Sequence, residues 1–118
     1  MPMPRVGDPS PDLMETIGVG APKLRGIKLS GANGNVELGL GRHVVGRADD
    51  TALTIRNPQV SRHHAAIVVM DADAAVEDNK SGNGTFVNTK RVQGAAMPLK
   101  SGDTVSFGSV EFTVELLS

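Results

Sequence analysis

The sequence of 118 residues contains no cysteine, no tryptophan and no tyrosine. The absence of cysteine excludes disulfides, thiolate zinc sites and a cysteine nucleophile, while it leaves the redox compartment open. Phenylalanine, present three times, is the only aromatic residue, so stacking platforms for nucleic-acid bases are not expected. Burial must come mainly from valine, leucine, isoleucine and alanine.

Long apolar runs are also missing. No stretch approaches the ~20 residues of a bilayer-spanning helix, and the start MPMPRVGDPSPD has no apolar region typical of a secretory signal. We therefore expect no membrane span and a cytoplasmic location. Twelve Lys+Arg against thirteen Asp+Glu give a formal net charge of −1, which argues against the broad basic surface of a nucleic-acid binder. Any anion site must be local.

Proline and strand patterns divide the chain into two parts. Residues 1–22 hold five of the seven prolines and show no sustained alternation, which predicts a flexible tail. Residues 23–118 carry short runs rich in Val, Ile and Thr between Gly, Asn, Asp and Ser clusters, which is typical of an all-β domain. About ten strands are expected, at 24–30, 35–40, 43–46, 52–55, 65–70, 75–78, 85–88, 97–100, 104–107 and 110–116. Such short strands favour a sandwich of two antiparallel sheets over a barrel.

Three loops combine small residues with hydrogen-bond donors. They are Gly46-Arg47, Ser61-Arg62-His63-His64, and Ser81-Gly82-Asn83-Gly84-Thr85 with Asn88 three residues later. A guanidinium, a hydroxyl, a second cation and the backbone N–H groups of a glycine-rich turn together suit a phosphate better than other common ligands. The sequence therefore predicts a local phosphate site on loops, and no cofactor.

Single residues in these loops also have simpler interpretations. Arg47, close to Asp49 and Asp50, taken alone fits an ordinary surface ion pair. His63 and His64 resemble a metal site, but neighbours at the start of a strand point to opposite faces and cannot share one ion. We expect no metal site.

A hydrolase is the enzyme class to weigh. Ser61, His64 and Asp78 are the residue types of a catalytic triad, yet the sequence has no G-x-S-x-G turn and no α/β pattern to carry one. We therefore expect no catalysis. Asn83-Gly84 also fits a tight hairpin turn, a role that is compatible with binding.

The order and spacing of the three loops resemble the forkhead-associated (FHA) domain. The similar features are Gly46-Arg47, Ser-x-x-His at 61–64, Ser-x-Asn-Gly-Thr-x-x-Asn at 81–88, and LKSGD at 99–103, which looks like the family's L-x-x-G-D run. The resemblance covers roughly residues 24–117. It implies an eleven-stranded β-sandwich that binds phosphothreonine peptides through loops at one end, with the termini at the other.

The resemblance also implies roles for single residues at the phosphate. Arg47 would grip the phosphate, Ser61 would donate its hydroxyl, and Arg62 would add a second charge. Gly82 departs from the family, because several relatives have Thr or Ser there, so its phosphate contact can only be a backbone N–H.

Other positions would bind the peptide or support the loops. Asn83 matches the residue that hydrogen-bonds the peptide backbone, and Gln59 lies where the family tends to read the third residue after the phosphothreonine. The residues expected to support the site structurally are Gly46, His64, Gly84, Thr85 and Asn88.

Two function classes stay open. One is a phosphothreonine-dependent interaction module that reads the marks written by a serine/threonine kinase on a partner protein. The other is a scaffold of the same fold that docks an unphosphorylated surface. A phosphopeptide titration separates them.

Thr16, beside Glu15 in the tail, is either an unmodified residue or a phosphorylation site. Some bacterial relatives look like the second case, with a phosphorylated N-terminal threonine that folds back onto the domain. The eight steps from Thr16 to Leu24 span at most ~27 Å when stretched and ~16 Å as a coil. Because the expected domain has a radius of gyration near ~12 Å, capture between two molecules, and hence self-association, is the expected form.

Overall fold

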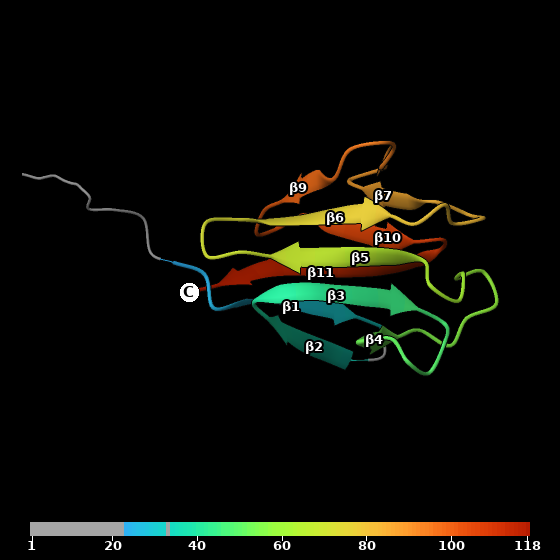
Figure 1. Ribbon diagram of the computed structural model, residues 1–118, viewed down its shortest axis with the longest axis horizontal. Coiled ribbons are helices and arrows are strands. Elements are labelled where there is room, and N and C mark those ends of the chain that lie inside the picture. The colour runs from blue at the N-terminus through green and yellow to red at the C-terminus, as the bar shows by residue number, and fades with distance from the viewer. Residues whose placement is uncertain (1–22, 33) are drawn as a thin grey trace, which may run out of the picture.

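Short runs of β-branched residues form eleven strands in residues 23–32 and 34–118, the part of the chain that the computed structural model describes (Figure 1). The strands are β1 (Gly26–Gly31), β2 (Gly34–Gly39), β3 (Gly41–Gly46), β4 (Leu53–Thr54), β5 (Ala65–Val69), β6 (Ala74–Asp78), β7 (Thr85–Val87), β8 (Lys90–Arg91), β9 (Met97–Leu99), β10 (Thr104–Phe107) and β11 (Val110–Leu117). One sheet has the order β2-β1-β11-β10-β7-β8 and the other β4-β3-β5-β6-β9. The predicted all-β sandwich of two sheets is confirmed. The tail 1–22, with Thr16, lies outside the described residues, and within them no helix is long and apolar enough to cross a membrane.

The structure corrects three details of the predicted strands. β8 was not predicted, because its two charged residues are exposed and pair with β7 through Phe86↔Arg91 and Val87↔Lys90 without an apolar pattern of their own. β4 has two residues instead of four and pairs in parallel with β3, in an otherwise antiparallel sandwich. Asn88 was predicted as the end of a strand but has a φ of 50°, so it belongs to the turn after β7.

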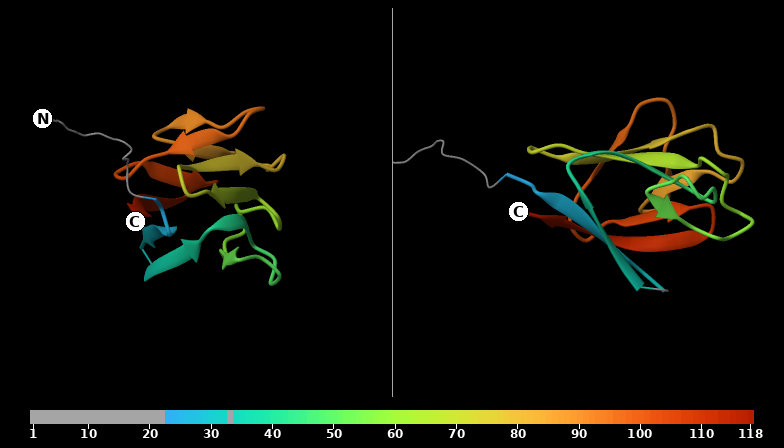
Figure 2. Two further views of the ribbon diagram at one scale, coloured as in Figure 1. Left: turned by 60° about the vertical axis from the view of Figure 1, so that its left-hand side comes forward. Right: turned by 60° about the horizontal axis from the view of Figure 1, so that its bottom comes forward.

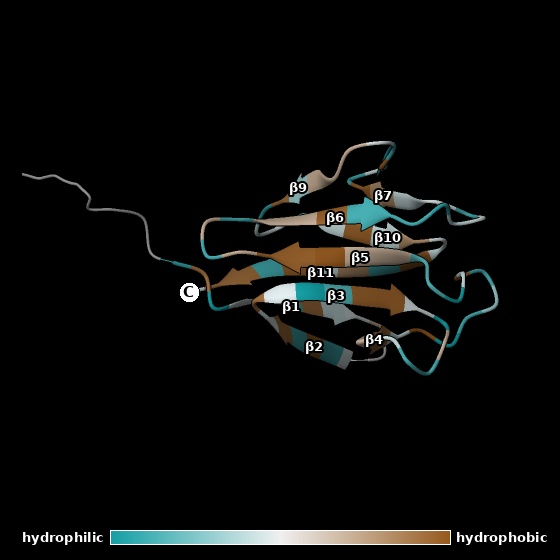
Figure 3. Ribbon diagram, viewed as in Figure 1, coloured by the Kyte–Doolittle hydropathy of each residue, from teal (hydrophilic) through white to brown (hydrophobic). Residues whose placement is uncertain are grey.

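The core lies between the sheets and is aliphatic, as the composition predicts. Residues that are at most 1% exposed come from both layers: Ile27, Leu29, Val105, Phe107 and Val114 from the six-stranded sheet, and Val45, Ile67, Val69 and Val76 from the five-stranded one. Figure 3 shows hydrophobic segments along the strands of both layers. Phe107 is the one fully buried phenylalanine among the described residues, and its ring packs edge-on against His64 and Phe112, with centroids 5.9 and 6.0 Å away.

The two ends of the sandwich differ. At one end, the chain enters near the C-terminus, where the N–H of Leu24 donates to Asp71 and the N–H of Arg25 to Leu117. The loops that follow β3, β4 and β6 lie at the opposite end (Figures 1 and 2). All three donor loops of the sequence therefore meet at one end of the scaffold.

We predict that Phe107→Ala lowers the free energy of unfolding by ~3–5 kcal/mol, because it opens a cavity that the packed aliphatic neighbours can only partly fill. Urea denaturation measures the loss. Phe86→Ala, at a half-buried position, is the control and should cost clearly less. Equal losses in the two variants would contradict the placement of Phe107 at the centre of the core.

Candidate functional site

Gly46 lets the end of β3 approach the Ser61–His64 segment closely. A Cβ at this position would lie 2.1 Å from the carbonyl oxygen of Arg62, so no other residue fits without moving the backbone. Just beyond it, the N–H of Arg47 donates to Ser61 O at 3.0 Å and the N–H of Ala48 to Arg62 O at 3.1 Å. These bonds hold the Arg47 and Ser61 loops side by side.

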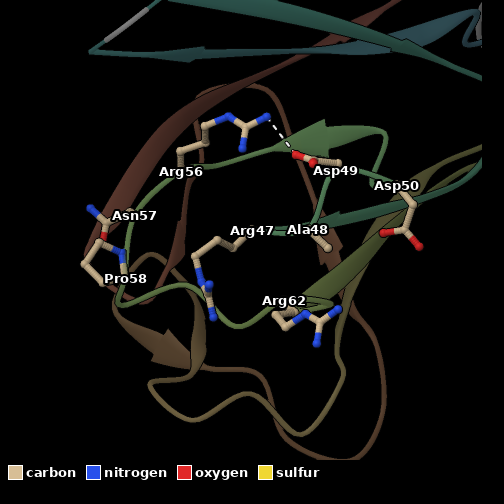
Figure 4. A pocket seen from close by; sticks show the side chains of 8 residues that line it. All are labelled: Arg47, Ala48, Asp49, Asp50, Arg56, Asn57, Pro58 and Arg62. Atoms are coloured by element: carbon tan, nitrogen blue, oxygen red, sulfur yellow. Dashed lines mark hydrogen bonds and ion pairs between the residues drawn. The ribbon is translucent and has the colours of Figure 1, made fainter.

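Arg47 is exposed and partly oriented by the backbone. Its Nε donates to the carbonyl oxygen of Val60 at 3.0 Å, which leaves its two terminal amino groups for a ligand. A surface pocket surrounds it, with Ala48, Asp49, Asp50, Arg56, Asn57, Pro58 and Arg62 as the other lining residues (Figure 4). Within the described ranges, Arg56 is paired with Asp49 at 2.8 Å, whereas Arg47 and Arg62 have no carboxylate partner. The pocket therefore contains two guanidinium groups that form no ion pair with a carboxylate of the described residues, although Arg62 helps His63 to lower the pKa of the Asp50 carboxyl.

His64 connects the second and third loops. It is fully buried, its Nδ1 accepts the N–H of Ser61 at 2.9 Å, and its Nε2 donates to the carbonyl oxygen of Gly84 at 2.8 Å. These partners require a ring with its proton on Nε2. The imidazole thereby fixes the position of Ser61 relative to the glycine-rich turn.

The hydroxyl of Ser61 lies beside the glycine-rich turn. The N–H of Gly82 donates to Ser61 Oγ at 3.2 Å, so the hydroxyl proton is available for another acceptor. Asn83 Nδ2 donates to the carbonyl oxygen of Gln59 at 2.8 Å, which leaves the second N–H and the oxygen of the amide. Gly82 and Asn83 are both exposed. The structure thus brings the donors of all three loops to one end.

Asp78 supports the glycine-rich turn, a role that the sequence analysis did not predict. Its carboxylate accepts the hydroxyls of Ser81 at 2.5 Å and Thr85 at 2.7 Å, and the N–H of Ser81 at 3.1 Å. Ser81 Oγ in turn accepts the N–H of Gly84 at 3.0 Å. An Asp three residues before a Ser at the start of a turn was the available signal, but Asp78 was weighed only as a triad member.

The triad and metal alternatives find no support in the geometry. Ser61 bonds His64 through its backbone N–H and not through its hydroxyl. His63 is exposed and contacts Asp50 Oδ1 at 2.8 Å, whereas the ring of His64 contacts Ser61 and Gly84, so the two rings share no partner. In the described part of the chain, no group of three His, Asp or Glu side chains could hold a metal ion.

Asn88 is the one candidate that braces a different turn. Its Nδ2 donates to Asp103 Oδ1 at 2.9 Å, and its Oδ1 accepts the N–H of Thr104 at 2.9 Å. Asp103 also accepts the N–H of Lys100 at 2.8 Å. Asn88 therefore holds the LKSGD turn against β7, at the end of that strand away from the pocket, rather than supporting the donor loops directly.

One family model and several known proteins are similar to this chain. Residues 43–108 match the sequence model of the FHA domain. The ABC transporter ATP-binding/permease protein Rv1747 of Mycobacterium tuberculosis is 41% identical over 75 residues, which are 64% of this chain and 8% of that protein. Among solved structures, an FHA domain from a structural and functional analysis of phosphothreonine-dependent FHA domain interactions is 29% identical, with a TM-score of 0.72 over 79% of this chain and 98% of the other.

The transcriptional regulatory protein EmbR is similar in sequence and in structure. The Mycobacterium tuberculosis protein is 33% identical over 72 residues, which are 61% of this chain and 18% of EmbR. EmbR in complex with a low-affinity phosphopeptide has a TM-score of 0.73 and 27% identity, covering 79% of this chain and 25% of that one. The chain thus spans less than a fifth of the curated relatives it matches, Rv1747 and EmbR.

We predict that Asp78→Asn removes part of the acid sensitivity of the fold. Burial raises the pKa of Asp78, but the hydrogen bonds from Ser81 and Thr85 outweigh it and hold the pKa below the ordinary value. The charged form therefore stabilises the fold above the unfolded pKa of ~3.9, and this contribution disappears as the pH falls through the lower, folded pKa.

Urea denaturation between pH 7 and 3 measures the effect. Asp78→Asn should be ~1–3 kcal/mol less stable at pH 7, because donors lose a charged acceptor, and its stability should fall less steeply below pH ~4. Asp73→Asn, in the exposed turn after β5, is the control and should follow the wild-type profile. A profile of Asp78→Asn parallel to the wild type would contradict the assigned role.

Proposed function

The chain belongs to the FHA domain family, whose members are non-catalytic, phosphothreonine-dependent interaction modules, and from this premise we propose that Arg47, Ser61, Arg62 and Gly82 bind the phosphate. A phosphothreonine carries about −1.5 to −2 charges and three acceptor oxygens at neutral pH. The terminal amino groups of Arg47 match two of these oxygens with charge-assisted bonds. The Ser61 hydroxyl and the Gly82 N–H serve the remaining acceptor positions, and Arg62 adds charge at the rim.

One observation carries the proposal. Three loops from different parts of the sequence place a guanidinium, a hydroxyl proton and a backbone N–H together, and the first two are tied by the bond from Arg47 N–H to Ser61 O. Among the described residues, the Ser61 hydroxyl proton has no hydrogen-bond acceptor, and the Gly82 N–H donates only to the neutral Ser61 Oγ at 3.2 Å. A phosphate therefore gains charged bonds at little cost in rearrangement.

Further residues bind the peptide or support the loops. Asn83 holds the peptide backbone with the amide atoms that its bond to Gln59 leaves available, and Gln59 faces the residue three positions after the phosphothreonine. Gly46, His64, Gly84 and Thr85 act through the geometry of the loops. In this proposal, a serine/threonine kinase phosphorylates the threonine of the partner protein in the cytoplasm, where ATP is present.

We predict that Arg47→Ala weakens binding of a phosphothreonine peptide by ~30- to 4,000-fold, because losing one partner of a desolvated charge pair costs ~2–5 kcal/mol. Arg62→Ala should cost ~1 kcal/mol, about fivefold, because its exposed side chain, unlike that of Arg47, is not oriented by a hydrogen bond to the backbone. Calorimetry with a peptide selected from an oriented phosphothreonine library measures both.

The controls separate the two function classes. Arg25 is an exposed arginine at the far end of the sandwich, so Arg25→Ala should leave the affinity unchanged. All three variants should remain folded. Unphosphorylated and phosphoserine versions of the peptide should bind more weakly than the phosphothreonine form. Equal binding of the unphosphorylated peptide would favour the phosphorylation-independent scaffold instead.

We also propose that Thr16, when phosphorylated, is a ligand of the same site in a second molecule. Leu24 and Arg25 are hydrogen-bonded to Asp71 and Leu117, at the end of the sandwich away from the pocket. The eight steps from Thr16 to Leu24 span at most ~27 Å. An intramolecular contact thus needs an almost fully stretched linker. Capture between molecules has no such constraint.

Phosphorylation of Thr16 is therefore predicted to produce dimers or larger oligomers whose fraction rises with concentration. Light scattering on the protein with phosphothreonine at position 16 measures this. Arg47→Ala and excess phosphothreonine peptide should both return the protein to a monomer. A phosphorylated protein that stays monomeric at every concentration, with unchanged peptide affinity, would exclude the proposal in both its forms.

A further inference from the structure

The outer face of the five-stranded sheet is apolar. Val45, Ile67 and Val76 point into the core and are fully buried, so the alternation along each strand directs their neighbours outward. These outward residues are Val44 on β3, Ala66 and Val68 on β5, Ala75 on β6 and Pro98 on β9. The register places Val68, Ala75 and Pro98 in one row across the sheet. Figure 3 shows β5 as a hydrophobic strand between β3 and β6.

One ion pair interrupts this face in the described part of the chain. Arg42 Nη2 lies 2.8 Å from Glu77 Oε1. The two residues belong to the strands on either side of β5, where they are in register with Val68 and Ala66. The pair therefore crosses over β5, which explains why Ala66 is only 1% exposed although it points outward. Because the two charges compensate each other, the strands of this face carry no net charge.

The outer face of the six-stranded sheet is polar by comparison. Its outward residues include Lys28, Glu37, Ser106, Glu111, Thr113 and Glu115. Polar side chains are the usual choice for a sheet face that meets water. An aliphatic outer face on the other sheet of the same domain is typical of a surface that another segment or protein covers.

The apolar face extends to the end of the sandwich at which the chain enters. Leu40 precedes β3 and Met70 follows β5, and they are 54% and 56% exposed. Both are the next residues beyond the last pair of the β3–β5 register. The N–H of Leu24 donates to the carbonyl oxygen of Asp71, one residue after Met70, at 2.8 Å. Residues 1–22 therefore join the described domain beside this end of the face.

The tail contains an apolar segment within reach of the face. Four of its large apolar residues fall within residues 13–19, namely Leu13, Met14, Ile17 and Val19. Val19 is five steps and Ile17 seven steps from Leu24, distances of at most ~17 Å and ~24 Å. The five residues of β5 extend ~17 Å at ~3.4 Å per residue. Both side chains can therefore reach the near half of the face without a fully stretched chain.

From these observations we propose that residues 13–19 dock on the outer face of the five-stranded sheet of the same molecule, with their aliphatic side chains on Val68, Ala75 and Met70. The attachment beside Met70 favours this occupant over a second copy, because a short linker gives a tethered segment an effective concentration in the millimolar range. A weak apolar contact is then enough to populate the docked form. The proposal goes beyond phosphate binding, since the face shares no residue with the arginine pocket.

Paramagnetic broadening in the full chain tests the proposal. Because the sequence has no cysteine, Ser10→Cys provides a single site for a nitroxide label, three residues before the segment. The label should reduce the peak intensities of the Val68 and Ala75 amides more than those of Lys28 and Thr113, because the two sheets lie ~10 Å apart and broadening falls steeply with distance. Equal losses on the two faces would overturn the proposal.

Variants remove the contact from either side. Ile17→Ser combined with Val19→Ser makes the segment polar. Val68→Thr combined with Met70→Gln makes the face polar at two outer positions and leaves the core unchanged. In each double variant the difference in intensity loss between the two faces should disappear, while the dispersed amide spectrum of the folded domain is retained.

Matched controls and a mixing experiment separate the outcomes. Val6→Ser, in the tail but outside the segment, and Thr113→Gln, on the polar face, should keep the difference. A difference that survives both double variants overturns the proposal. Spin-labelled protein mixed with unlabelled ¹⁵N protein should leave the Val68 amide at full intensity; broadening there would assign the face to a second copy and overturn the tail as its occupant. No readout involves a phosphopeptide, so each of these failures leaves the proposed function standing.

Discussion

The site depends on the close approach of the end of β3 to the carbonyl of Arg62, which is open only to glycine at position 46. From this contact the backbone bonds of Arg47 and Ala48 follow, which hold the Arg47 loop beside Ser61, while the bond from Arg47 Nε to Val60 O orients the guanidinium. His64 then carries the same constraint to the glycine-rich turn through Gly84. Because His64 packs on Phe107, the loops are tied to the centre of the core.

This arrangement explains how a protein with a net charge of −1 gathers arginine side chains at one end of its scaffold. Asp49 pairs with Arg56 and Asp50 contacts His63, whereas no carboxylate of the described residues forms an ion pair with Arg47 or Arg62 within 4 Å. The carboxylate of Asp78, the remaining acid of the region, accepts hydrogen bonds from the hydroxyls of Ser81 and Thr85. Positive charge is thus concentrated where the loops converge, and a preorganised site loses little entropy when a ligand binds.

The sequence predicted the sandwich and most of its strands because alternating apolar residues and turn residues are local signals. It also predicted the residues that meet at the loops, since their order resembles a known family. It missed β8, whose two charged residues form a strand only because β7 lies beside them. It could not show the close contact of Gly31 with the Phe112 ring either, because these residues are far apart in the sequence and become neighbours only through the pairing of β1 with β11. The role of Asp78 was available from its spacing to Ser81, but the triad alternative obscured it.

The most direct test of the central claim is a nuclear magnetic resonance titration that follows every backbone amide while a phosphothreonine peptide is added. The account predicts that the largest shifts occur at Arg47, Ser61 and Gly82, that the strands of both sheets change little, and that the unphosphorylated peptide leaves these three amides unmoved. Shifts that are equal for both peptides, or that cluster near Leu24 and Leu117 at the other end of the sandwich, would contradict it.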